Sequence, residues 1–152
     1  MTVISTTMNK TQLNEDRLLT GHEKFKIHGD AINEKQLKAI ISACKGLKYH
    51  WNCRKKALQV KNIIGGVVIL GETMILSGDL KSAYGHYFNP PYEFHAWVQL
   101  PKGVIVDVAL PGLIETGLNF SDDQGPFIVG REPVVLAGRP ESWMKYVPKK
   151  IY

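Results

Sequence analysis

Cysteine is scarce in this chain, and long apolar runs are missing. The 152 residues contain two cysteines, Cys44 and Cys53, with no C-x-x-C pair and no paired Cys/His spacing. This argues against a structural zinc site and against a disulfide-stapled secreted scaffold. The longest apolar stretch, 63–70, contains two glycines and is far short of the roughly 20 residues that a membrane-spanning helix needs. The Thr- and Asn-rich first 15 residues lack the apolar centre of a signal peptide, so we expect a cytoplasmic protein with no membrane partner.

Charge of one sign is in moderate excess only. Lys and Arg number 19 against 14 Asp and Glu, a net charge of +5, and 44% of the residues are hydrophobic. That composition suits one packed domain rather than a disordered chain. The lysines are scattered rather than interleaved with aromatic residues along one stripe. We therefore do not expect nucleic acid as the main partner, and a basic nucleic-acid-binding protein stays an alternative that charge alone permits.

The helical patterns divide the chain into a lead-in and a domain. Residues 1–32 show no clear apolar period, so we predict an N-terminal arm or lead-in there and a single domain over 33–152. A first helix follows Asn33, a good N-cap with Gln36 as its capping-box partner. A second helix extends from about Asn52 to residue 63 or 64 and ends at the glycine pair 65–66.

Strand patterns dominate the rest of the sequence. We predict a strand over 67–76 that is broken or kinked at Gly71, then a long loop over 77–92 that is rich in turn formers. Apolar and polar residues alternate from residue 94 to 100, and a second strand follows at 104–109. A third strand is predicted at 133–137, with the tail packing back onto the body. Helices followed by an antiparallel sheet indicate an α+β domain.

The two cysteines occupy different settings. Cys44 falls on the apolar stripe of the first helix, where a small buried thiol is expected. Cys53 falls at the first turn of the second helix, where unpaired backbone N–H groups and the positive end of the helix dipole favour a thiolate. Cys53 is therefore the better candidate nucleophile, although a small core residue at this position is the plain alternative.

A thiol nucleophile needs a base, and the base needs a group that orients it. Of the five histidines, only His95 lies within a predicted strand. If residues 101–103 form a three-residue hairpin loop, His95 and Asp107 share one face of the sheet as diagonal neighbours. A two-residue loop would put Asp107 on the opposite face. Asp107 on a wet edge strand would be ordinary surface, but a carboxylate among valines is costly to bury without a partner.

The runs HAWV at 95–98 and GVIVD at 103–107 resemble the core motif of the transglutaminase-like superfamily, which belongs to the papain-like thiol enzymes. The segment 53–57 is similar to the beginning of that family's nucleophile helix. The resemblance covers about 52–110, under half of the chain. One departure is that the family usually has a small residue before the cysteine, whereas this chain has Trp51 and Asn52.

The resemblance implies a transglutaminase-like or papain-like core that carries a catalytic triad. Cys53 would be the nucleophile, His95 the general base and then acid, and Asp107 the residue that holds the imidazole. The reaction would be acyl transfer from a peptide or protein amide through a thioester, to water or to an amine, with no metal or cofactor required. An inactive binding module on the same fold is the alternative. Candidate oxyanion or substrate residues are Trp51, Asn52, Gln59, Trp97 and Gln99.

Overall fold

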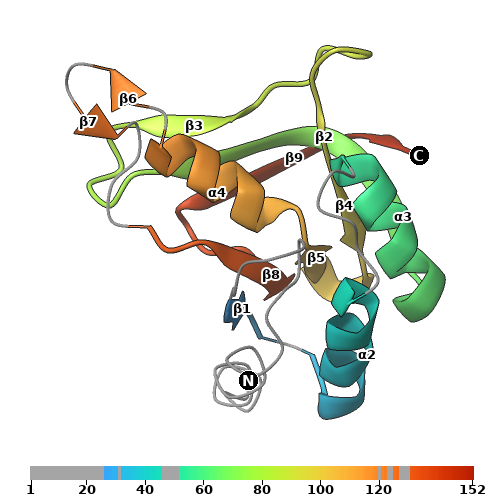
Figure 1. Cartoon of the computed structure of the whole chain (residues 1–152). Coiled ribbons are helices and arrows are strands. Elements are labelled where there is room, and N and C mark those ends of the chain that lie inside the picture. Colours follow the sequence, from blue (N-terminus) through green and yellow to red (C-terminus); the bar gives the residue numbers. More distant parts are fainter. Residues whose placement is uncertain (1–25, 31, 46–51, 120, 123–124, 127–130) are drawn as a thin grey trace.

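The computed structural model describes residues 26–30, 32–45, 52–119, 121–122, 125–126 and 131–152. Three helices lie around one large sheet in this part of the chain (Figure 1). The helices are α2 (Glu34–Lys45), α3 (Cys53–Ile64) and α4 (Leu110–Asn119). The strands of the large sheet are β1 (Lys26–His28), β2 (Val67–Leu76), β3 (Ala83–His86), β4 (His95–Gln99), β5 (Ile105–Asp107), β8 (Val134–Gly138) and β9 (Met144–Ile151). A separate small pair is formed by β6 (Ser121–Asp122) and β7 (Gly125–Pro126).

The large sheet is mixed. Its described strands follow the order β1–β8–β5–β4–β2–β3, and β9 pairs with β2. Strands β1 and β8 are parallel, and the other described pairs are antiparallel. The α+β class is confirmed. The expectation of an antiparallel sheet is wrong in one place. Strand β1, which precedes the helices in the sequence, lies parallel to β8 at the edge of the sheet.

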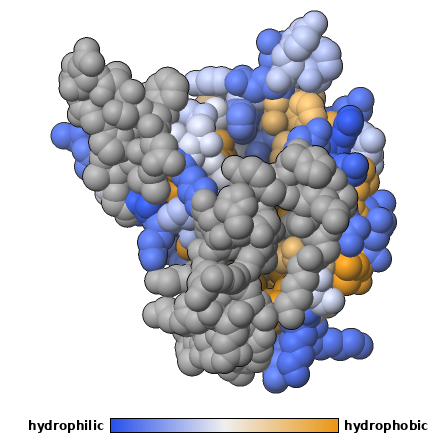
Figure 2. Space-filling view, in the orientation of Figure 1, coloured by the Kyte–Doolittle hydropathy of each residue, from blue (hydrophilic) through white to orange (hydrophobic). Residues whose placement is uncertain are grey.

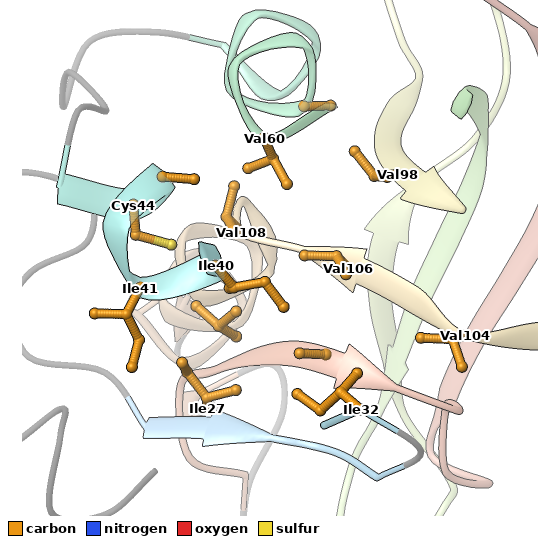
Figure 3. Packing of buried hydrophobic residues seen from close by; sticks show 14 of the residues in the cluster. Ile27, Ile32, Ile40, Ile41, Cys44, Val60, Val98, Val104, Val106 and Val108 are labelled. Carbon is orange, nitrogen blue, oxygen red and sulfur yellow. The ribbon is translucent and has the colours of Figure 1, made fainter. Parts of the chain in front are cut away.

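The sheet separates two hydrophobic clusters, each covered by helices. Alternating side chains of a strand point to opposite faces, so Trp97 and Val98 belong to different clusters. Helices α2 and α3 cover the Val98 face, where Ile40 and Val60 pack toward the strands (Figure 3). Helix α4 covers the Trp97 face, where Leu110 is fully buried. The candidate site residues are therefore anchored in a packed core from both sides.

Both predicted helices and their caps are confirmed. The Asn33 side chain accepts from the Gln36 backbone N–H at 2.7 Å, and the Gln36 side chain accepts from the Asn33 N–H at 3.0 Å. The Asn52 side chain accepts from the Lys55 N–H at 2.9 Å. Helix α3 ends at Gly65, whose φ of 83° is in the left-handed region that favours glycine. These local signals fix where each helix begins and thereby place Cys53 at a helix start.

The predicted hairpin register is confirmed as well. The Leu100 N–H donates to the Val104 carbonyl oxygen at 2.8 Å, and Gln99 lies opposite Ile105. The three residues between the strands form a short 3₁₀ turn, with Lys102 at a φ of 65°. Strand β2 spans its predicted residues, and its pairing with β9 shifts register at Gly71. A Cβ at Gly71 would collide with the Val147 carbonyl oxygen, so this close approach requires glycine.

Two elements lie where no regular structure was predicted. The expected loop over 77–92 contains β3, which pairs with the end of β2. Helix α4 follows the hairpin, and its sequence includes Pro111, Gly112 and Gly117, residues that usually mark turns. The third predicted strand is confirmed as β8, and the tail forms β9 on the sheet. Tertiary packing of Leu113 and Ile114 on the sheet outweighs the weak local propensity of α4.

The predicted lead-in can be compared only from residue 26 onward, because residues 1–25 lie outside the described residues. Its last part joins the sheet as β1, and Ile27 and Ile32 are buried in the core. Hydrophilic side chains occupy much of the described surface in Figure 2, with smaller hydrophobic areas between them. Among the described residues, none of the helices has the length and apolar character needed to span a bilayer.

Candidate active site

Cys53 is the first residue of α3, and it lines a cleft. Its side chain is half-buried, and its Sγ lies 3.9 Å from the Phe94 carbonyl oxygen, to which the thiol donates. The first N–H groups of a helix have no partner within the helix, and the dipole is positive there. These groups attract the negative charge of a thiolate and of an oxyanion formed beside it. The cap made by Asn52 therefore sets the thiol at an electropositive position that a substrate can reach.

His95 and Asp107 form the hydrogen bond that the hairpin register predicts. His95 Nε2 lies 2.7 Å from Asp107 Oδ2, and both side chains are almost completely buried. The Ala109 N–H donates to the other carboxylate oxygen at 3.0 Å. The Asp107 carboxylate is thus satisfied by fixed donors, which explains how it is accommodated at 1% exposure.

The His95 imidazole also interacts with the Cys53 side chain. Burial alone lowers the pKa of His95, but the Asp107 charge and hydrogen bond, assisted by a hydrogen bond and charge interaction with Cys53, raise it to about 10. Because His95 Nε2 forms the hydrogen bond to Asp107, Nδ1 is the ring nitrogen that can interact with the Cys53 thiol. Cys53, His95 and Asp107 thus form one continuous contact chain from the cleft into the core.

Tyr146 is a member of the site that the sequence patterns did not indicate. Its hydroxyl donates to Asp107 Oδ2 at 2.6 Å, the same oxygen that His95 contacts. Burial raises the pKa of Tyr146, and the nearby Asp107 charge raises it further, so the phenol stays protonated and donates. Tyr146 comes from β9, and only its pairing opposite Thr73 on β2 brings it here. A tail residue of this kind has no local motif that could have identified it.

Two further charged or titratable groups surround the triad. Lys56 lies about one turn along α3 from Cys53, and it is only 8% exposed. Burial lowers the pKa of Lys56, while electrostatic interaction with Cys53 and with the Asp107 carboxylate opposes that effect. The His86 ring stacks on His95 at 6.0 Å between centroids. Burial and the His95 charge lower the pKa of His86, so it is an uncharged neighbour at neutral pH.

The other candidate residues divide into those at the cleft and those away from it. Asn52 lines the cleft beside Cys53, and its side-chain oxygen caps α3. Gln59 lies about 9 Å further along α3 and is not among the cleft residues. Gln99 lies about 13 Å along β4 from His95, where it accepts from Trp97 Nε1 at 3.5 Å. Trp51 lies outside the described residues.

Trp97 lies below the triad rather than at the cleft. It is 1% exposed, its ring centroid is 6.2 Å from that of His95, and it packs edge-on to Tyr146 at 5.0 Å. Its position on the His95 face matches the prediction from strand alternation. The indole therefore covers the His95–Asp107 pair from the core side and keeps water from that hydrogen bond.

The cleft beside Cys53 has a volume of about 530 Å³, within the range of small-molecule and peptide-side-chain pockets. Among the described residues, no three His, Cys, Asp or Glu side chains are grouped as metal ligands would be. Comparison of the chain with protein-family models, curated proteins and solved structures gave no match. A half-buried thiol, a buried imidazole and an adjoining cleft are what the residues themselves provide.

Proposed function

We propose that this protein is a cysteine-dependent acyl-transfer enzyme that acts on a peptide or protein amide through a thioester intermediate. The observation that supports this most is the contact chain from the Cys53 thiol through the His95 imidazole to the buried Asp107 carboxylate. A nucleophile, a base and an orienting group in contact are the arrangement that covalent acyl transfer uses. The transglutaminase-like resemblance of the same residues agrees with this proposal.

In the first half of the reaction, the proton shared by Cys53 and His95 lies on His95 Nδ1, because the pKa of His95 is raised to about 10. The resulting thiolate attacks the substrate carbonyl carbon, and a C–S bond forms while the carbonyl π pair moves to oxygen. We assign the Cys53 backbone N–H, at the start of α3, and the side-chain amide of Asn52, which lines the cleft, as donors to that oxyanion. Asp107 keeps the charged imidazole in place, because its Oδ2 accepts from Nε2 throughout.

In the second half, the tetrahedral intermediate collapses and the C–N bond breaks. The leaving amine takes the proton from His95 Nδ1, and the acyl group remains on sulfur as a thioester. Water or a second amine then attacks that thioester and loses its proton to His95 Nδ1. The C–S bond breaks, and the pair of Cys53 thiolate and His95 imidazolium is restored. Both outcomes use the same three side chains, and the identity of the acceptor decides between hydrolase and acyltransferase.

The test compares the two cysteines of one chain. We expect a low concentration of iodoacetamide to alkylate the wild type and Cys44→Ala to one equivalent at pH 6.5, located at Cys53 by peptide mass mapping. The Cys53→Ala variant should remain unlabelled under the same conditions. Equal labelling of wild type and Cys53→Ala, or a Cys53 that reacts no faster than free cysteine, would overturn the proposal and favour an inactive binding module on this fold.

A further inference from the structure

The cleft at Cys53 is built from four segments that are distant in the sequence. The start of α3 provides Cys53, strand β2 provides Leu70, the segment between β3 and β4 provides residues 90–92, and the C-terminal segment provides Lys150 of β9 and Tyr152 just after it. Figure 1 shows the C-terminal end of β9 beside the beginning of α3. The nucleophile of the proposed reaction is thus part of the cleft wall, so the wall groups are the ones that would contact the acyl donor.

The charged side chains in this wall are both cations. Arg54 and Lys150 line the cleft, and no Asp or Glu is among its lining residues. Arg54 lies with its guanidinium 5.4 Å from the centroid of the Tyr152 ring, a cation–π contact. Among the described residues, neither Arg54 nor Lys150 forms an ion pair. The N-terminal end of α3 adds positive potential at the same place.

The rest of the wall is apolar or aromatic. Leu70, Phe94 and Pro91 contribute apolar surface, and Tyr92 is 90% exposed at the rim. An exposed tyrosine and a proline offer flat, rigid surface on which an apolar or aromatic side chain can pack. The cleft therefore combines a site for negative charge with a site for an apolar group, both next to the thiol.

We propose that the cleft selects an acyl donor that carries a carboxylate beside an apolar or aromatic residue, close to the bond that Cys53 attacks. This inference rests on the proposed function, because it assigns the substrate class of the same thiol. Arg54 and Lys150 hold the carboxylate, and the proline and aromatic wall holds the apolar neighbour. Both an Asp or Glu side chain and a free C-terminal carboxylate supply this chemistry, so the experiment separates these two sources.

Two alkylating probes that differ only in charge test the cleft without knowledge of the substrate. Iodoacetate is an anion and iodoacetamide is neutral, and in both the thiolate forms a C–S bond as iodide leaves. We take the ratio of the second-order rate constant for iodoacetate to that for iodoacetamide. At low salt we expect this ratio at Cys53 to exceed the ratio for free cysteine by about fivefold or more. The excess should shrink at 0.5 M salt, because salt screens the attraction between the surface cations and the anionic probe.

A charge-matched pair of double variants locates the effect. Arg54→Gln with Lys150→Gln should return the ratio to that of free cysteine, whereas Lys61→Gln with Lys149→Gln should leave it raised. Lys61 and Lys149 are exposed on the same two elements, and neither lines the cleft. A fast-reacting Cys53 with no preference for iodoacetate, or equal loss of preference in both double variants, would overturn the inference and leave the acyl-transfer proposal standing. A Cys53 that is unreactive to both probes would overturn both.

Peptide probes then distinguish the two sources of the carboxylate. Vinyl sulfone peptides with Phe next to Glu or next to Gln report a side-chain carboxylate, through the rate of covalent labelling at Cys53. Peptides that end in Phe followed by a free carboxylate or an amide report a C-terminal one, through protection of Cys53 from iodoacetamide. We expect one acidic member of the two pairs to exceed its neutral partner by about fivefold, an advantage lost in the Arg54/Lys150 double variant. Equal behaviour of acid and neutral members in both pairs would contradict the inference.

Discussion

Helices α2 and α3 are closely matched, yet they place their cysteines in opposite environments. Each has twelve residues and begins after an asparagine whose side chain caps the first turn. Cys44 lies next to the last residue of α2 and is buried, whereas Cys53 is the first residue of α3 and faces the cleft. The position along the helix and access to solvent, rather than the residue type, therefore set the environment of each thiol.

Electrostatics separates the two thiols further. Burial raises the pKa of Cys44 to about 12, and the opposing effect of Lys56 does not offset it. Cys44 therefore stays a neutral thiol at neutral pH, packed in the core between α2 and the sheet. Cys53 instead contacts an imidazole and lies at the positive end of a helix dipole. Lys56 interacts with both sulfurs. The difference between the environments of the two thiols therefore comes from burial and from the contact with His95.

The largest effect is expected when the base is removed. We expect His95→Ala to slow the alkylation of Cys53 at pH 6.5 by about 10²-fold or more, the usual contribution of a positioned base. Stopped-flow alkylation with mass mapping measures this rate. His86→Ala is the matched control, because that ring stacks on His95, whereas the described donors to the Asp107 carboxylate are His95, Ala109 and Tyr146. A loss of similar size in His86→Ala, or none in His95→Ala, would remove the distinction between Cys53 and Cys44.

The second effect is on stability as a function of pH. The pKa of His95 is raised from 6.5 to about 10, so the folded protein holds a proton that the unfolded chain releases between these values. The stabilisation is complete below pH 6.5 and is lost as the pH rises toward 10. In that window we expect the free energy of unfolding to fall by up to about 1.4 kcal/mol per pH unit.

Urea denaturation of the wild type and of His95→Gln between pH 6.5 and 10 measures this slope. Because other groups titrate in the same window, the difference between the two curves isolates His95. Parallel curves would mean that His95 does not hold an extra proton in the folded state. The measurement also sharpens the comparison of the cysteines, since burial keeps Cys44 neutral while a carboxylate partner keeps the equally buried His95 charged.

The parts of the fold that the sequence predicts are those with strong local chemistry. The caps at Asn33 and Asn52 and the hairpin loop at 101–103 fix helix starts and strand register within a few residues. Helix α4 escapes prediction because its proline and glycines look like a turn, and only packing on the sheet reveals it. Strand β1 is not predicted either, because a parallel edge strand of three residues is too short to show an apolar pattern.

The site follows the same rule. His95 and Asp107 are predictable because alternation and loop length place them on one face, and the structure joins them at 2.7 Å. Tyr146 and Lys56 are not predictable, because one reaches the carboxylate from the far end of the chain and the other looks like a surface lysine of α3. Long-range strand pairing and burial are the physical causes, and neither is encoded in a short motif.

The third prediction concerns Tyr146. Tyr146→Phe keeps the ring that packs on Trp97 but removes the donor to Asp107 Oδ2. We expect unfolding to become easier by about 1.5 kcal/mol, the usual net value of a hydrogen bond to a charged group. The pKa of His95, followed by NMR, should rise, because Oδ2 then accepts from the imidazole alone. Tyr87→Phe, an exposed tyrosine, serves as the control and should change neither quantity. A loss of stability without any change at His95 would make Tyr146 a purely structural residue.

The smallest effects come from the two caps, and they test the comparison of the helices most directly. Asn33→Ala and Asn52→Ala each remove one side-chain cap, so each should lower the free energy of unfolding by about 1 kcal/mol. Only Asn52→Ala should also slow the alkylation of Cys53, because Asn52 both orients the first turn of α3 and lines the cleft. Thermal unfolding and alkylation rates on the same samples measure both quantities. Equal effects of the two variants on Cys53 would show that the helix start does not govern the reactivity of this thiol, since loss of stability alone would then account for the change.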